Sequence, residues 1–159
     1  MHRTVFFVIL HVMKAIIIED EPLSAAELRT SLAEVAPHIE VVATASSVAE
    51  AVETVSRVGH DLIFMDIHLE DGSGFDIFER ADISVPVIFI TAYDSYALKA
   101  FENKGIDYLL KPFGRDDLRR AIAKLGLLSG GELRLRSTAP RRRRLRPTRN
   151  ASWYTWAPG

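Results

Sequence analysis

The chain has 159 residues, of which 48% are hydrophobic and 26% are charged, and its formal net charge is −1. These values are typical of a soluble globular protein with one domain of ordinary size and some additional segments. The absence of cysteine excludes disulfides, a thiol nucleophile and a cysteine-based metal site, and suits a location in the reducing cytoplasm. The charge is unevenly spread: the segment from Gly126 onward has eight Arg and one Glu, a net charge of +7, and the preceding part carries −8.

The first twelve residues include an apolar stretch over residues 5–10. This stretch is shorter than the roughly 20 residues that span a bilayer, and no small-residue cleavage site follows it, as a signal peptide would require. A strand-like segment begins directly after Met13. We therefore interpret residues 1–12 as an N-terminal extension, either from a mis-assigned start codon or as a genuine added strand, and we expect no membrane association.

Strand-like and helix-like segments alternate five times between residues 13 and 125. Strands are predicted over residues 14–18, 39–44, 62–65, 86–91 and 106–110. Because these runs are largely Ile, Val, Leu and Phe, we expect them to be buried on both faces, as in a parallel sheet covered by helices. The pattern predicts an α/β protein of (βα)5 type over residues 13–128.

The segments between the strands have apolar residues at helical spacing. The first helix is predicted after Pro22, a residue suited to the first turn, and the second after a capping box formed by Ser47 and Glu50. Three further helices are predicted around the apolar residues Phe75, Ile77 and Phe78; Ala97, Leu98 and Phe101; and Leu118, Ile122 and Leu125.

Four of the predicted strands end on polar residues. Glu19 and Asp20 follow the first strand, Asp66 the third, Thr91 ends the fourth and Lys111 follows the fifth. Ligands of open parallel sheets bind outside the carboxyl ends of the strands, so we expect these side chains to converge. Clustered carboxylates repel and raise at least one pKa, and Mg2+ held by carboxylates, phosphate and water removes that repulsion. The alternative is a set of solvated acids at strand ends.

This constellation resembles the receiver domain of two-component response regulators, the CheY-like domain, over about residues 13–125. The resemblance implies a flavodoxin-like, doubly wound fold with strand order 2-1-3-4-5, and a phosphoacceptor, Asp66, that a sensor histidine kinase phosphorylates. It further implies that Asp20 binds Mg2+ directly, that Glu19 acts partly through water and that the backbone carbonyl of His68 is a ligand. Such a domain is not an enzyme beyond its own phosphorylation and dephosphorylation.

The resemblance also assigns roles to three residues on the fourth and fifth strands. Lys111 would gather phosphoryl oxygens together with Mg2+, and its bond to Pro112 would be cis, an option largely confined to proline. Thr91 would be the switch hydroxyl and Tyr108 its aromatic partner, although the strand pattern alone favours a packing role for Tyr108. The glycine-containing segment 71–74 is interpreted as a turn rather than a phosphate cradle.

Residues 93–102 and 105–113 are similar to the receivers of the LytTR (LytR/AlgR) class of transcriptional regulators. In that class a β-rich DNA-binding domain follows, whereas the residues after Leu125 do not read as strands. We therefore expect either a truncated regulator or a receiver that acts alone through protein contacts, and no DNA binding. The class also implies a possible homodimer through the face of the fourth helix, fifth strand and fifth helix.

Two alternatives remain, one for the function of the predicted domain and one for the C-terminal segment. A haloacid-dehalogenase-like phosphohydrolase also forms an aspartyl phosphate, but its nucleophile follows the first strand and a cap covers its substrate. The second alternative concerns residues 129–159, where four consecutive Arg begin at Arg141. This tail has few contiguous apolar residues and is predicted to be disordered, and an Arg-rich arm of this kind could instead grip nucleic acid through phosphate contacts.

Overall fold

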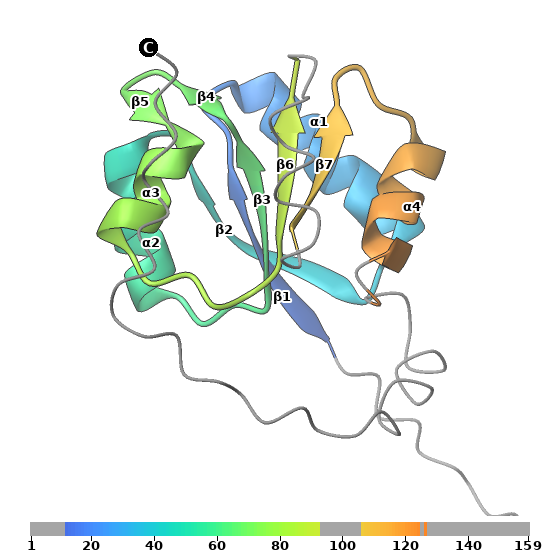
Figure 1. Ribbon diagram of the computed structural model, residues 1–159. Coiled ribbons are helices and arrows are strands. Elements are labelled where there is room, and N and C mark those ends of the chain that lie inside the picture. The colour runs from blue at the N-terminus through green and yellow to red at the C-terminus, as the bar shows by residue number, and fades with distance from the viewer. Residues whose placement is uncertain (1–11, 93–105, 125, 127–159) are drawn as a thin grey trace, which may run out of the picture.

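A computed structural model describes residues 12–92, 106–124 and 126 (Figure 1). The strands are β1 (Met13–Ile18), β2 (Ile39–Ala45), β3 (Leu62–Asp66), β4 (His68–Leu69), β5 (Gly72–Ser73), β6 (Val87–Thr91) and β7 (Ile106–Leu110). The helices in these ranges are α1 (Pro22–Val35), α2 (Val48–Arg57), α3 (Gly74–Arg80) and α4 (Arg115–Lys124). The predicted helix around Ala97 and Phe101, the extension before Val12 and the Arg-rich tail lie outside the described residues.

Five strands form one parallel sheet in the order β2-β1-β3-β6-β7. Since β6 and β7 are the fourth and fifth strands of this sheet along the chain, the order is 2-1-3-4-5. The flavodoxin-like α/β fold is therefore confirmed. The remaining two strands, β4 and β5, form a small antiparallel hairpin between β3 and α3.

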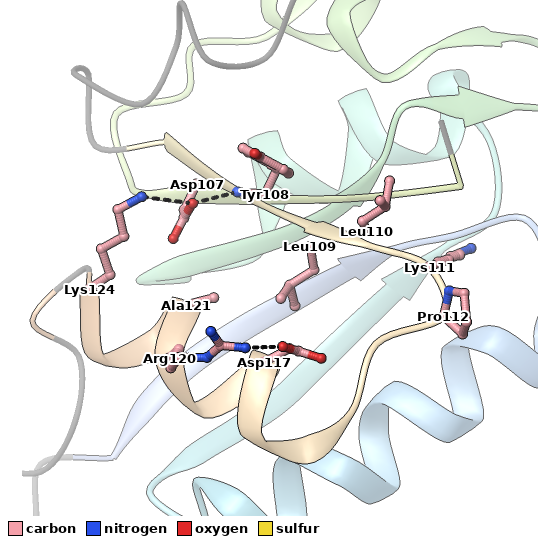
Figure 2. Close-up of a pocket in the computed structure, with 10 residues that line it drawn as sticks. All are labelled: Asp107, Tyr108, Leu109, Leu110, Lys111, Pro112, Asp117, Arg120, Ala121 and Lys124. Atoms are coloured by element: carbon pink, nitrogen blue, oxygen red, sulfur yellow. Dashed lines mark hydrogen bonds and ion pairs between the residues drawn. The ribbon is translucent and has the colours of Figure 1, made fainter. Parts of the chain in front are cut away.

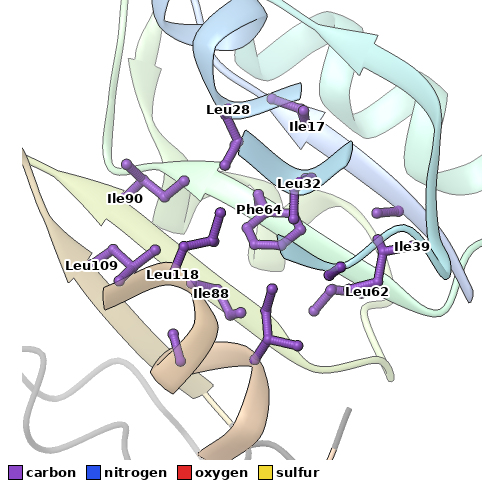
Figure 3. Close-up of a cluster of buried hydrophobic side chains, with 14 residues drawn as sticks. Ile17, Leu28, Leu32, Ile39, Leu62, Phe64, Ile88, Ile90, Leu109 and Leu118 are labelled. Carbon is purple, nitrogen blue, oxygen red and sulfur yellow. The ribbon is translucent and has the colours of Figure 1, made fainter. Parts of the chain in front are cut away.

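Helices cover both faces of the sheet (Figure 1). Leu32 of α1 and Leu118 of α4 pack on one face, in a cluster that includes Phe64 (Figure 3). Val55 of α2 and Ile77 of α3 pack on the other face. All five residues of β3 are buried, alternately on the two faces, because a central strand of such a sheet has no solvent-facing side. No helix in the described ranges has the length and apolar character needed to cross a membrane.

The start of α2 differs from the predicted capping box. Ser47 does accept the backbone N–H of Glu50 at 3.1 Å, as predicted. The Glu50 carboxylate, however, accepts the backbone N–H and the hydroxyl of Ser46, each at 2.8 Å. The second contact of the predicted box, from the Ser47 N–H to the Glu50 carboxylate, was therefore wrong, because Ser46 offers two donors to one oxygen of that carboxylate.

A complete capping box begins α3 instead. The Ser73 hydroxyl accepts the Phe75 N–H at 3.2 Å, and the Asp76 carboxylate accepts the Ser73 N–H at 2.9 Å. The turn interpretation of the glycine-containing segment is confirmed, since this segment closes the β4–β5 hairpin and leads directly into α3. Pro22 occupies the first turn of α1, also as predicted.

Candidate functional site

The polar strand ends meet at one edge of the sheet. Glu19 and Asp20 follow β1, Asp66 ends β3, Thr91 ends β6 and Lys111 follows β7. Strand pairing aligns these ends, because Asp66 lies opposite Ile90 and Thr91 lies opposite Leu110. In a parallel sheet every strand points the same way, so the residues that end neighbouring strands share one rim.

Three carboxylates form an acidic cluster on this rim. Each of Glu19, Asp20 and Asp66 offers a carboxylate oxygen, and these oxygens lie within 4.8 Å of one another. Two of the three side chains are oriented by backbone donors: Glu19 Oε1 accepts the Glu21 N–H at 3.0 Å, and Asp66 Oδ1 accepts the His68 N–H at 3.0 Å. Glu19 and Asp66 are each only 9% exposed, so the cluster is a partly desolvated site rather than a set of free surface acids.

The ammonium group of Lys111 joins two of these carboxylates. Its Nζ lies 2.8 Å from Glu19 Oε2 and 3.1 Å from Asp66 Oδ2. The Lys111–Pro112 peptide bond is cis, as the resemblance implied, and the Lys111 N–H donates to the Thr91 carbonyl at 2.7 Å. One cation is thus placed against the free oxygen of the proposed phosphoacceptor.

Burial and charge shift the pKa values of two groups in the cluster. Burial is the largest cause of the raised pKa of Glu19, and the charge of Asp66 adds to it, while hydrogen bonds from Lys111 and the Glu21 N–H act in the opposite sense. The expectation that one clustered carboxyl has a raised pKa is confirmed, with burial rather than repulsion as its main cause. Burial alone would lower the pKa of Lys111, but its hydrogen bonds and attraction to both carboxylates outweigh burial and raise it.

The donor set fits a hard divalent cation. Carboxylate oxygens are the ligands that Mg2+ prefers, and Mg2+ commonly uses one or two of them together with phosphate and water. The predicted backbone ligand, His68, begins β4 two residues after Asp66, and its side chain is exposed. This position is compatible with a role of its backbone rather than its imidazole. The carbonyl contact itself stays a prediction.

Thr91 and Tyr108 lie on the adjacent strands β6 and β7, Thr91 at the rim and Tyr108 two residues before the end of β7. Thr91 is fully buried. Tyr108 of β7 is half-buried, lies opposite Phe89 and packs against the hydrophobic cluster between the sheet and helices α2 and α3. Figure 2 shows Tyr108 and Leu109 on opposite sides of β7.

An open pocket of about 640 Å3 runs along β7 and α4, and its lining includes Lys111 but none of the three carboxylates of the acidic cluster. This pocket is therefore a neighbouring surface and not the cation site.

The structural roles of two residues near the site were not predicted from the sequence. Asp71, assigned only to a turn, accepts backbone N–H groups of α2, a contact between segments that a local pattern does not reveal. Gly74 begins α3 so close to β3 that a Cβ atom there would lie 2.5 Å from the Asp66 carbonyl oxygen. The Gly-x-Gly pattern was the available signal for Gly74, and it indicates close backbone approach as well as a turn.

The chain resembles known proteins over the same region. Residues 15–123 match the response regulator receiver domain. The sensory transduction protein LytT of Enterococcus faecalis is 45% identical over 115 residues, which cover 70% of this chain and 47% of LytT. The sensory transduction protein LytR of Staphylococcus saprophyticus is 40% identical over 116 residues, or 71% of this chain and 45% of LytR. The chain thus spans about half the length of these curated relatives.

A solved receiver structure shows the same fold. The receiver domain of the response regulator PhyR from Erythrobacter litoralis superimposes with a TM-score of 0.63 and 29% sequence identity. The match covers 76% of this chain and 95% of the PhyR domain. The family match over residues 15–123 includes the acidic cluster and Lys111, so it covers the part of the chain that carries the site.

Proposed function

Because this chain belongs to the response regulator receiver family, we propose that it is the phosphoacceptor module of a two-component system, phosphorylated on Asp66 by a sensor histidine kinase. The observation that carries the proposal is the position of Asp66, which belongs to the acidic cluster while its Oδ1 accepts the His68 N–H at 3.0 Å and its Oδ2 lies 3.1 Å from Lys111 Nζ. Mg2+ is the proposed cofactor, held by Glu19, Asp20, Asp66 and the His68 carbonyl.

Each residue has a distinct part in the proposed transfer. The Asp66 carboxylate attacks the phosphorus atom of the donor, and the bond from phosphorus to the kinase histidine breaks as the new P–O bond forms. Lys111 leaves its ion pairs to meet a phosphoryl oxygen, where its positive charge stabilises the transferred group. Bound Mg2+ would supply further positive charge to the same oxygens. Before transfer, the contacts with Glu19 and Asp66 raise the pKa of Lys111 and favour its charged form.

The proposed output is a change of surface near β7. Thr91 would turn its hydroxyl toward the phosphoryl group, and Tyr108 would change rotamer with it. Such a switch is a population shift, whose size depends on how differently the two states bind the phosphoryl group. The affected surface consists of β7, α4 and the predicted helix around Ala97, and we expect a homodimer to form through it. Sedimentation that shows an unchanged monomer with and without beryllofluoride would contradict this part.

Labelling with acetyl phosphate and Mg2+ tests the phosphoacceptor. Wild type should gain the mass of one phosphoryl group by intact-mass analysis, and Asp66→Asn should gain none. Asp82→Asn serves as the matched control, because Asp82 is an exposed acid beyond α3 and should label like wild type. Equal labelling of Asp66→Asn and wild type would sink the assignment. Lys111→Ala should fold but respond poorly, since the change removes a charge from the rim and leaves the core intact.

The same preparation distinguishes a receiver from a phosphohydrolase. A receiver should transfer one phosphoryl group to itself and release it slowly, without turning over a general phosphate ester. Sustained hydrolysis of p-nitrophenyl phosphate that Asp66→Asn abolishes would favour the enzyme. We place the signalling in the cytoplasm and expect its output to be transmitted by protein contacts rather than by direct DNA binding.

A further inference from the structure

The carboxylate of Asp71 joins two segments that are distant in the sequence. Asp71 lies in the turn of the β4–β5 hairpin, and its Oδ1 accepts the Val48 N–H at 2.7 Å while its Oδ2 accepts the Ala49 N–H at 3.1 Å. Both donors belong to the first turn of α2. Backbone N–H groups at a helix start have no partner within the helix, so a carboxylate that receives two of them is a strong cap.

The other donors at this end of α2 have local partners. Ser47 accepts the Glu50 N–H through its hydroxyl, and its carbonyl accepts the Ala51 N–H at 2.9 Å. The start of α2 is thus capped by the neighbouring residue Ser47 and by Asp71 of the hairpin. Asp71 has a lowered pKa, mainly because of the Val48 N–H, which agrees with a carboxylate that remains charged in this contact.

The hairpin that contains Asp71 also contains His68, whose backbone contacts the proposed phosphoacceptor. His68 begins it, and the His68 N–H donates to Asp66 Oδ1 at 3.0 Å. The Gly74 N–H closes its other end on the Ile67 carbonyl at 2.7 Å. Leu69 is 8% exposed and packs in the cluster that contains Val48. The Asp71 contact therefore fixes the free end of a hairpin whose base orients Asp66.

We propose that Asp71 is a positioning residue for the acidic site: by tying the hairpin to α2, it holds the Asp66 carboxylate and the His68 backbone in the geometry that binds a divalent cation. This inference rests on the proposed function, because it concerns the same cation site. Residues that orient metal ligands change metal affinity by about 10- to 100-fold when they are replaced. Since Asp71 acts through a short hairpin, we expect a loss near the lower end of that range.

The test compares two ways of weakening the same helix start. Asp71→Ala removes the hairpin's cap, and Ser47→Ala removes the local cap, so both variants should lose thermal stability and exchange the first α2 amides faster. Calorimetric titration with Mg2+ alone should show about tenfold weaker binding for Asp71→Ala and nearly unchanged binding for Ser47→Ala. Without Mg2+, amide hydrogen exchange of residues 67–69 should accelerate only in Asp71→Ala. Asp71→Asn, which keeps an acceptor oxygen, should recover part of the affinity and also serves if the alanine variant does not fold.

The outcomes separate the two proposals. If wild type binds no Mg2+, the proposed function fails, and this inference fails with it. If wild type binds Mg2+ and the Asp71 and Ser47 variants bind it equally well, the proposed function stands and the positioning role is overturned. Unchanged exchange at residues 67–69 in Asp71→Ala would likewise overturn the role, because the hairpin would then hold its shape without the contact.

Discussion

Replacement of Gly74 by alanine should disturb the phosphoacceptor through the backbone. A Cβ atom at this buried position would lie 2.5 Å from the Asp66 carbonyl oxygen, and 3.0 and 3.1 Å from Sδ and Cγ of Met65. Met65 is a flexible side chain and can yield. The Asp66 carbonyl cannot move alone, because β3 is paired on both sides and Asp66 itself lies opposite Ile90 in β6. Either α3 or the end of β3 must shift.

The expected cost follows from these contacts. Overpacking of a well-packed interior costs about 1–3 kcal/mol of stability. Part of this cost is offset, because glycine is less favourable than alanine inside a helix by about 1 kcal/mol. This recovery is small at the first position of α3, so we expect the free energy of unfolding to fall by about 1–2 kcal/mol. In a small domain each 1 kcal/mol lowers the Tm by about 4–8 °C.

Urea denaturation of Gly74→Ala and Gly59→Ala measures the effect against a matched control. A Cβ atom at Gly59 would meet nothing within 4 Å. Gly59→Ala should therefore be neutral or stabilise by about 0.4–1 kcal/mol, through the entropy of the unfolded chain. Gly74→Ala should also label more slowly with acetyl phosphate. Wild-type stability together with wild-type labelling in Gly74→Ala would refute the view that the backbone at Asp66 is held rigidly.

Three further predictions concern the core, the helix cap and the cation. Leu118→Ala should lower the free energy of unfolding by about 2–5 kcal/mol in urea titrations, because Leu118 is fully buried between α4 and the sheet (Figure 3), and a loss below 1 kcal/mol would contradict that packing. The pKa of Glu50 is lowered from 4.5 by the N–H and hydroxyl of Ser46, so Glu50 stabilises the fold above pH 4.5 and loses this effect as the pH falls through its folded pKa; Glu50→Gln should flatten that part of the Tm–pH curve, and an unchanged slope would count against the cap. Mg2+ at 100 times its Kd should stabilise wild type by about 2.7 kcal/mol, measured as a Tm shift that chelation reverses, and the shift should nearly vanish in Asp20→Asn.

The ends of the strands could be predicted from the sequence because the strands themselves are almost completely buried. A run such as Leu62–Met65 has no exposed face in a central parallel strand, so the first charged residue after it, Asp66, must lie at the rim. The same logic located Glu19 and Lys111. It does not give the distances between them, since the Lys111 ion pairs depend on the cis peptide and on the register of β6 and β7.

Contacts between segments were the part that could not be predicted. Ser47 and Glu50 have the spacing of a capping box, but Ser46 competes for the Glu50 carboxylate through two donors. Asp71 reaches α2 from 22 and 23 residues further along the chain, and nothing in its local pattern distinguishes it from an ordinary turn residue. Local propensity predicts which groups need partners, whereas the packing of the hairpin on α2 decides which partners they find.

The Lys111 ion pairs also set the charge that an incoming phosphoryl group meets. Three carboxylates and one ammonium leave a formal charge of −2 on the rim. One divalent cation cancels this charge, so a phosphoryl group carrying two negative charges would approach a neutral site instead of a repulsive one. If Lys111 were absent, the same cation would leave the rim at −1. The lysine therefore completes a charge balance that a single divalent cation could not achieve, and phosphate analogues should compete poorly at this rim unless both Lys111 and the divalent cation are in place.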